Sequence, residues 1–228
     1  MKTIRFLETE RLYDQAASRF ETLSARACRA RGRFLVALAG GSTPLALYAR
    51  LARSKAIDWE KAHIFWSDER CVPPDDSASN FGAARRTLLD HVPIPEDQIH
   101  RIEGERDPLD AADAYEVLVR RELGGSDPFD LILLGIGVDG HTASLFPRHQ
   151  ALTETERWVL PVHAPSEPPW RVTMTLPLIN AARNVLLLAV GTDKADAVRA
   201  FHEGATIPAS SIRPERGQAT LLTDAEAM

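Results

Sequence analysis

The feature that most limits how this chain can fold is a short apolar run, residues 131–134, that ends in glycine. Runs of this length that are bounded by glycine or proline are typical of strands buried on both faces. Such strands occur mainly in parallel sheets, whose successive strands are joined by long crossovers that usually contain a helix. The run therefore predicts an α/β fold.

The rest of the sequence shows the alternation that a parallel sheet requires. Apolar runs predict strands at 34–39, 63–66, 129–135, 172–175, 185–190 and 220–222. Helical periodicity predicts helices at 8–31, 44–53, 81–91, 109–123 and 194–201. This order indicates a mostly parallel sheet with helices on both faces. The proline-rich segment 161–170 is interpreted as a loop rather than a linker, so we expect a single domain over residues 1–228.

Composition and charge exclude several classes of protein. The net charge of −5 argues against electrostatic binding to nucleic acid, so a small anionic ligand must be held by local cations. The two cysteines, Cys28 and Cys71, lack the spacing of a metal site and favour a reducing compartment over a disulfide scaffold. No charged leader and no apolar run of about 18 residues is present, so we expect a cytoplasmic protein without a membrane span.

The run at 131–134 is followed at once by a polar turn that contains Asp139, Gly140 and His141. Ligand crevices of open α/β sheets lie outside the carboxyl ends of the strands, where this turn is expected. His141 can exchange a proton near neutral pH, and Asp139 can accept a hydrogen bond from one ring nitrogen while the other acts as a base. We also expect Thr142 and Ser144 to cap a helix that starts here. The alternative interpretation is a plain turn with a solvent-facing histidine.

A second strand end carries a glycine-rich loop with Gly41, Ser42 and Thr43. Glycines let the backbone approach a ligand, and unpaired amides at a helix start can bind phosphate. The loop is neither a Walker loop nor a dinucleotide fingerprint. An ordinary turn with a hydroxyl cap is the competing interpretation.

The end of a third strand contributes charged and polar side chains. The strand at 63–66 is followed by Asp68, Glu69 and Arg70, and Asn80 comes soon after. These groups can orient hydroxyls or neutralise an oxyanion, and Asn80 either caps the next helix or lines the same crevice. A surface ion pair between Glu69 and Arg70 is the simpler explanation.

Arg171 stands at the start of the run at 172–175, and Lys194 follows the run at 185–190. An arginine there can bind phosphate through two hydrogen bonds, and a lysine adds a point charge. Strand ends on one edge of a parallel sheet would bring the two cations together. Taken singly, each is by default interpreted as a solvated surface cation.

Five motifs taken in order resemble those of the 6-phosphogluconolactonase family and span nearly the whole chain. They are Ala39-Gly40-Gly41-Ser42-Thr43-Pro44, Trp66-Ser67-Asp68-Glu69-Arg70 with Ser79-Asn80, the turn from Gly135 to Pro147, Arg171 to Thr175, and Gly191 to Ala195. The resemblance implies a Rossmann-like α/β fold and the hydrolysis of 6-phospho-D-glucono-1,5-lactone in the oxidative pentose phosphate pathway, without a cofactor.

The resemblance also implies a set of roles. His141 would activate water and then protonate the leaving oxygen, Asp139 would orient it, and Arg70 would recognise the oxyanion or a hydroxyl. Six residues would complete the phosphate and substrate site together with Asp68: Gly41, Ser42, Thr43, Asn80, Arg171 and Lys194.

Two alternatives stay open at this stage. A glucosamine-6-phosphate deaminase would share the fold, but that family has an acidic residue shortly after the histidine, and residues 142–147 contain none. A non-catalytic sugar-phosphate-binding protein would keep the cations but could discard Asp139 and His141. No cluster has recognisable zinc spacing, so we expect no metal site. The oligomeric state is open, with a monomer favoured.

Overall fold

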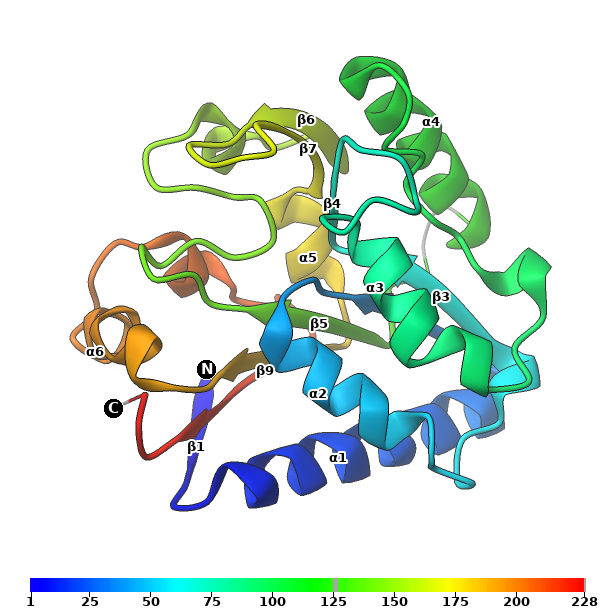
Figure 1. Cartoon of the computed structure of the whole chain (residues 1–228), viewed down its shortest axis with the longest axis horizontal. Helices are drawn as coiled ribbons and strands as arrows, with labels where there is room; N and C mark the ends of the chain where they lie inside the picture. The colour runs from blue at the N-terminus through cyan, green and yellow to red at the C-terminus, as the bar shows by residue number, and fades with distance from the viewer. Residues whose placement is uncertain (125–126, 228) are drawn as a thin grey trace.

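Six parallel strands form the central sheet of the molecule (Figure 1). The computed structural model describes residues 1–124 and 127–227. The strand order is β1-β9-β8-β5-β2-β3, and every neighbouring pair is parallel. The strands are β1 (Lys2–Phe6), β2 (Phe34–Leu38), β3 (Ala62–Trp66), β5 (Leu131–Gly135), β8 (Asn184–Ala189) and β9 (Gln218–Asp224).

A second sheet of three antiparallel strands lies beside the first, in the order β4-β7-β6. Its strands are β4 (Asp68–Arg70), β6 (Val159–His163) and β7 (Trp170–Met174). The α-helices are α1 (Thr9–Arg31), α2 (Ser42–Leu51), α3 (Asn80–Thr87), α4 (Pro108–Glu122), α5 (Leu176–Ala181) and α6 (Ala195–His202). Figure 1 shows α1 and α2 on one side of the parallel sheet, and α5 with the antiparallel sheet on the other. The α/β fold with a mostly parallel sheet is therefore confirmed.

The strand predicted at 172–175 does not belong to the parallel sheet. It is β7, which pairs antiparallel with β4 and β6, and Arg171 stands near its beginning. A single short run cannot reveal this pairing, because β4 consists of three polar residues and has no apolar pattern. The segment interpreted as a loop at 161–170 also contains the end of β6.

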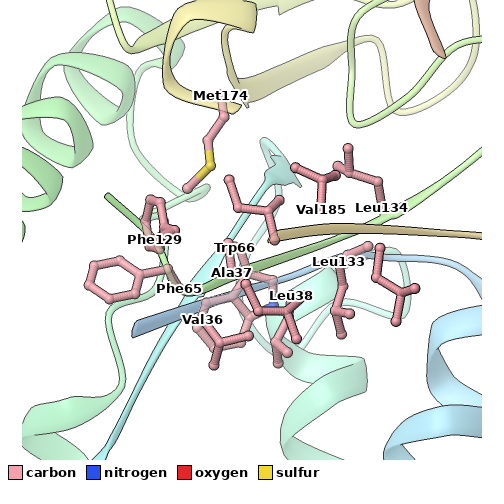
Figure 2. Close-up of a cluster of buried hydrophobic side chains, with 14 of the residues drawn as sticks. Val36, Ala37, Leu38, Phe65, Trp66, Phe129, Leu133, Leu134, Met174 and Val185 are labelled. Atoms are coloured by element: carbon pink, nitrogen blue, oxygen red, sulfur yellow. The ribbon is translucent and has the colours of Figure 1, made fainter. Parts of the chain in front are cut away.

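The core joins both sheets through close side-chain packing. Phe65 of β3 meets Phe129 edge-to-face, with ring centroids 5.0 Å apart. Figure 2 shows Met174 of β7 reaching toward these two rings from the antiparallel sheet. All three side chains are fully buried, so the small sheet is fixed on the large one by apolar contact. No helix in the described residues is long and apolar enough to cross a membrane.

Two buried tyrosines fix the ends of neighbouring strands. The hydroxyl of Tyr48, on α2, accepts from the N–H of Ala39 at 2.9 Å and donates to its carbonyl at 2.7 Å. Tyr115, on α4, makes the same pair of bonds with Trp66, at 2.9 and 3.0 Å. Each hydroxyl satisfies two backbone groups where a strand stops, and this sets the path of the polar loop that follows.

Candidate active site

A cleft of about 260 Å³ opens at the carboxyl ends of β2, β3, β5 and β8. After β2 the chain adds β3 on one side, and it later returns on the other side with β5, so β2 and β5 flank the point where the strand order reverses. Crevices of open α/β sheets form at such points. All but one of the site residues predicted from the sequence line this cleft: Gly41, Ser42, Thr43, Asp68, Arg70, Asn80, His141, Arg171 and Lys194. The exception is Asp139.

His141 and Asp139 form a hydrogen-bonded pair at the edge of the cleft. Nδ1 of His141 lies 2.5 Å from Oδ1 of Asp139, and the same oxygen accepts from the backbone N–H of His141 at 3.1 Å. Burial alone would raise the pKa of Asp139, but these two bonds hold it below its ordinary value. An ionised Asp139 keeps the proton on Nδ1, which leaves the lone pair of Nε2 free to act as a base.

The turn fits closely around the imidazole. A β-carbon on Gly137 would overlap the ring of His141, so only glycine fits beneath it. The N–H of Gly137 also donates to the carbonyl of His141 at 2.8 Å. The ring of Phe146 packs against the imidazole, with the two ring centroids 4.7 Å apart. The position of the ring is thus set by contacts on several sides.

The helix predicted to start in this turn is absent. Ala143 and Arg148 have positive φ angles of 48° and 63°, which a right-handed helix cannot contain. The hydroxyl of Thr142 donates back to the carbonyl of Gly135 at 2.9 Å instead of capping a helix. Ser144 likewise turns inward, and its hydroxyl donates to Asp68 at 2.7 Å. This turn therefore offers no helix N-terminus to an anion.

Asp68 is a buried carboxylate that joins three segments of the site. Besides Ser144, it is tied to Asn80, whose side-chain amide donates to the carbonyl of Asp68 at 2.9 Å. The backbone N–H of Ser144 in turn donates to the hydroxyl of Thr173 on β7 at 3.1 Å. Asn80 therefore lines the crevice, while the preceding residue, Ser79, is the one that caps α3.

Glu69 is buried rather than paired with Arg70 at the surface. Its carboxylate accepts from the backbone N–H groups of Asn80 and Phe81, both at 2.7 Å, and from the hydroxyl of Ser79. Burial raises the pKa of Glu69 despite these bonds. Glu69 thus fixes the start of α3 beside the cleft, and the surface-ion-pair interpretation is wrong.

Two arginines face the cleft from neighbouring strands. Arg70 and Arg171 are directly opposite each other in the β4–β7 pairing. Burial lowers the pKa of Arg171, and the charge of Arg70 lowers it further. Arg171 is also bonded to the loop before β7, through the carbonyl of Pro168 at 3.3 Å and the hydroxyl of Ser166 at 3.0 Å. Like charges held this close favour an anion between them.

The remaining cationic and amide groups reach the same cleft from β2 and β8. Helix α2 begins at Ser42 directly after Gly41, whose φ of 99° suits glycine, and no side chain caps this end. The first amides of α2 are therefore available to a phosphate. Lys194 stands in the turn after β8 and pairs with its neighbour Asp193 at 3.0 Å.

Several supporting residues of the site have roles that the sequence alone does not predict. Tyr48 lies outside the motifs and acts through its two bonds to Ala39. Ser144 and Thr173 lie within motifs, but their roles depend on contacts between segments that are distant in the sequence. Gly137 is one of the glycines of the predicted turn, but only the folded structure shows that it lies against the ring of His141. Among the described residues, the one group of histidine and acidic side chains close enough to share a metal ion lies outside this cleft.

Comparison with known proteins gives matches over nearly the whole chain. Residues 7–221 match the family model described as glucosamine-6-phosphate isomerases/6-phosphogluconolactonase. A 6-phosphogluconolactonase from Mycobacterium tuberculosis is 42% identical over 90% of this chain and 88% of its own length. The crystal structure of a 6-phosphogluconolactonase from Thermotoga maritima has a TM-score of 0.88 at 29% identity, covering 98% of this chain and 100% of that chain. A monomeric glucosamine-6-phosphate deaminase has a TM-score of 0.85 at 25% identity, covering 100% and 98% of the two chains.

Proposed function

The chain belongs to the family of glucosamine-6-phosphate isomerases and 6-phosphogluconolactonases, and from that premise we propose how its cleft hydrolyses 6-phospho-D-glucono-1,5-lactone to 6-phospho-D-gluconate. This reaction belongs to the oxidative pentose phosphate pathway. The observation that carries the mechanism is the His141–Asp139 pair, which stands at the edge of a cleft lined by cations and by an uncapped helix start.

His141 is the base that activates water. Its Nε2 takes a proton as the water oxygen attacks the lactone carbonyl, and Asp139 stabilises the imidazolium that forms. The carbonyl electrons move onto oxygen, giving a tetrahedral oxyanion that Arg70 stabilises. When the oxyanion collapses, the bond to the ring oxygen breaks and the imidazolium returns its proton to that oxygen. The product is an open-chain acid, and the enzyme is restored.

The phosphate of the substrate binds away from the reacting carbonyl. Arg171, Lys194 and the amides of Ser42 and Thr43 are the groups that hold it. Binding a remote, non-reacting group positions the lactone carbonyl next to the activated water and so contributes to the rate. Asp68 and Asn80 orient sugar hydroxyls. The buried carboxylate can accept hydrogen bonds from them, and the side-chain amide can accept or donate.

Deamination of glucosamine 6-phosphate is the competing activity, because a deaminase shares the fold. The segment 142–147 has no carboxylate, and this favours the lactonase. The test measures lactone hydrolysis above the spontaneous background and ammonia release from glucosamine 6-phosphate, with wild type and His141→Ala side by side. We expect the wild type to hydrolyse the lactone without releasing ammonia, and His141→Ala to lose the hydrolysis. Ammonia release would support the deaminase, and the absence of both activities would support a non-catalytic binding protein.

We also propose a cytoplasmic monomer. Cys28 and Cys71 are free thiols, as expected in a reducing compartment. Burial raises the pKa of Cys71 to about 11, so this thiol stays protonated at neutral pH and takes no part in the mechanism. Light scattering of the purified protein tests the oligomeric state, and a mass of twice the chain's 25.2 kDa would contradict it.

A further inference from the structure

Three side chains that the lactone chemistry does not use meet at the amino end of β3. His63 is the second residue of that strand, and Glu122 is the last residue of α4. His100 is brought alongside by the chain after Ile99, because its backbone N–H donates to the carbonyl of Ile64 at 2.8 Å. One potential ligand atom from each of the three side chains lies within 4.8 Å of the other two.

The spacing of the two imidazoles fits a metal ion. Nδ1 of His63 lies 3.1 Å from Nε2 of His100. In a tetrahedral zinc site with bonds of about 2.0–2.1 Å, two nitrogen ligands stand about 3.3 Å apart. A shift of a few tenths of an ångström would therefore bring the two nitrogens to this spacing, and the carboxylate of Glu122, which has an oxygen within 4.8 Å of both, would move toward them by up to about 1.5 Å. His100 is also held in place by Phe65, whose ring stacks on it at 4.4 Å.

The protonation states suit metal binding. Burial lowers the pKa of His63, and it lowers the pKa of His100 to about 4, so both rings are neutral at pH 7 with a lone pair to offer. Burial opposes ionisation of Glu122, but the hydrogen bond and the charge of Arg121 hold its pKa below the ordinary value. Arg121 is 68% exposed, so its ion pair with Glu122 gives way at little cost.

We propose that His63, His100 and Glu122 bind one zinc ion, with water in the fourth position. Two imidazoles and a carboxylate are a ligand set that zinc prefers, and His63 and Glu122 are only partly buried, which leaves an entry path. The ion ties the end of α4 to β3 and to the segment after Ile99. It is remote from catalysis, because His63 is near the start of β3 whereas the cleft opens at the end of that strand, and the three residues from His63 to Trp66 span about 10 Å of extended chain.

Titration calorimetry with zinc chloride on chelator-treated full-length protein tests this site. We expect one ion per chain, with Kd raised at least 100-fold in His63→Gln and about 10- to 100-fold in Glu122→Gln. His202→Gln is the matched control, because it removes an exposed histidine at the end of α6 and should leave Kd unchanged. Zinc at about 100 times Kd should raise the Tm of the wild type by roughly 5 °C and that of His63→Gln by much less.

A direct hydrogen bond between the two histidines is the competing explanation of the 3.1 Å distance. It predicts no zinc binding at micromolar concentrations, and that result would overturn the proposal. Zinc binding of undiminished affinity in His63→Gln would place the ion outside this cluster, and zinc binding that inhibits lactone hydrolysis in step with occupancy would place it in the cleft; either result would overturn the proposal. Hydrolysis that is equally fast with zinc and with chelator, together with the loss of affinity in His63→Gln, supports it.

Discussion

The imidazole of His141 is positioned by a glycine as much as by its carboxylate partner. A methyl group on Gly137 would overlap the ring, which therefore has to leave its place beside Asp139. We predict that Gly137→Ala lowers the rate of lactone hydrolysis by about 10²–10⁴-fold, the contribution expected of a positioned base, while the protein stays folded. Steady-state kinetics and circular dichroism measure the two effects.

Gly135→Ala provides the matched control for this prediction. It adds the same methyl group to the same turn, where nothing lies within 4 Å of the new carbon. The rate of Gly135→Ala should stay much closer to that of the wild type. The double variant Gly137→Ala/His141→Ala should be no slower than His141→Ala alone. Equal losses in the two glycine variants would mean that crowding of the cleft, rather than displacement of His141, limits the rate.

At the scale of elements, the phosphate site depends on cations from segments that are far apart in the sequence. Arg171 comes from β7 and Lys194 from the turn after β8. We predict that replacing either with alanine weakens binding of 6-phosphogluconate about tenfold to hundredfold and leaves binding of gluconate nearly unchanged, because a charge-assisted contact is worth roughly 1.5–3 kcal/mol. Calorimetric titration of both ligands measures this. Arg213→Ala, at an exposed position outside the cleft, is the control. Equal effects on the two ligands would show that the cations are merely solvated.

The two buried tyrosines give a test of how strand ends set the site. Tyr48→Phe leaves the N–H and carbonyl of Ala39 without their partner, which costs roughly 1–3 kcal/mol and loosens the loop that follows β2. Tyr115→Phe removes the same two bonds at Trp66, on β3. We predict similar losses of stability in urea unfolding, but a larger loss of affinity for inorganic phosphate in Tyr48→Phe. Equal losses of affinity would limit both tyrosines to a role in stability.

The strand ends were predictable because parallel strands have a strong local signal. The buried runs at β2, β3, β5 and β8 are short, apolar and followed by glycine or polar residues, so the sequence indicated both the sheet and the residues of the cleft. The antiparallel sheet has no such signal. Its strand β4 is Asp68-Glu69-Arg70, and pairing with β7, which brings Arg171 opposite Arg70, depends on contacts over about a hundred residues. Local patterns also could not reveal that Ser144 turns inward to Asp68.

At the scale of the whole molecule, the antiparallel sheet that carries both arginines is held by α4. Glu116 on that helix is a buried carboxylate that accepts from Arg120 at 2.7 Å, from Arg157 at 2.9 Å and from the backbone N–H of Trp158 at 3.3 Å. Arg157 and Trp158 lead directly into β6. The antiparallel sheet therefore depends on a charged contact at its outer end as well as on the apolar core.

The protonation of Glu116 links this contact to pH. Burial would raise its pKa, but the bonds from Arg120 and Arg157 lower it below the ordinary value. The stabilisation is therefore present above about pH 4.5 and is lost as pH falls through the lowered pKa. We predict that Glu116→Gln reduces the free energy of unfolding by about 1.5–3 kcal/mol at pH 7, and that its difference from wild type narrows below pH 4.5. Urea unfolding at both pH values measures this.

Asp113→Asn, which also loses a contact with Arg157 but at a carboxylate that is 56% exposed, should cost less than about 1 kcal/mol. If the free energy of unfolding lost in Glu116→Gln were the same at both pH values, packing of the side chain rather than its charge would be what stabilises the sheet.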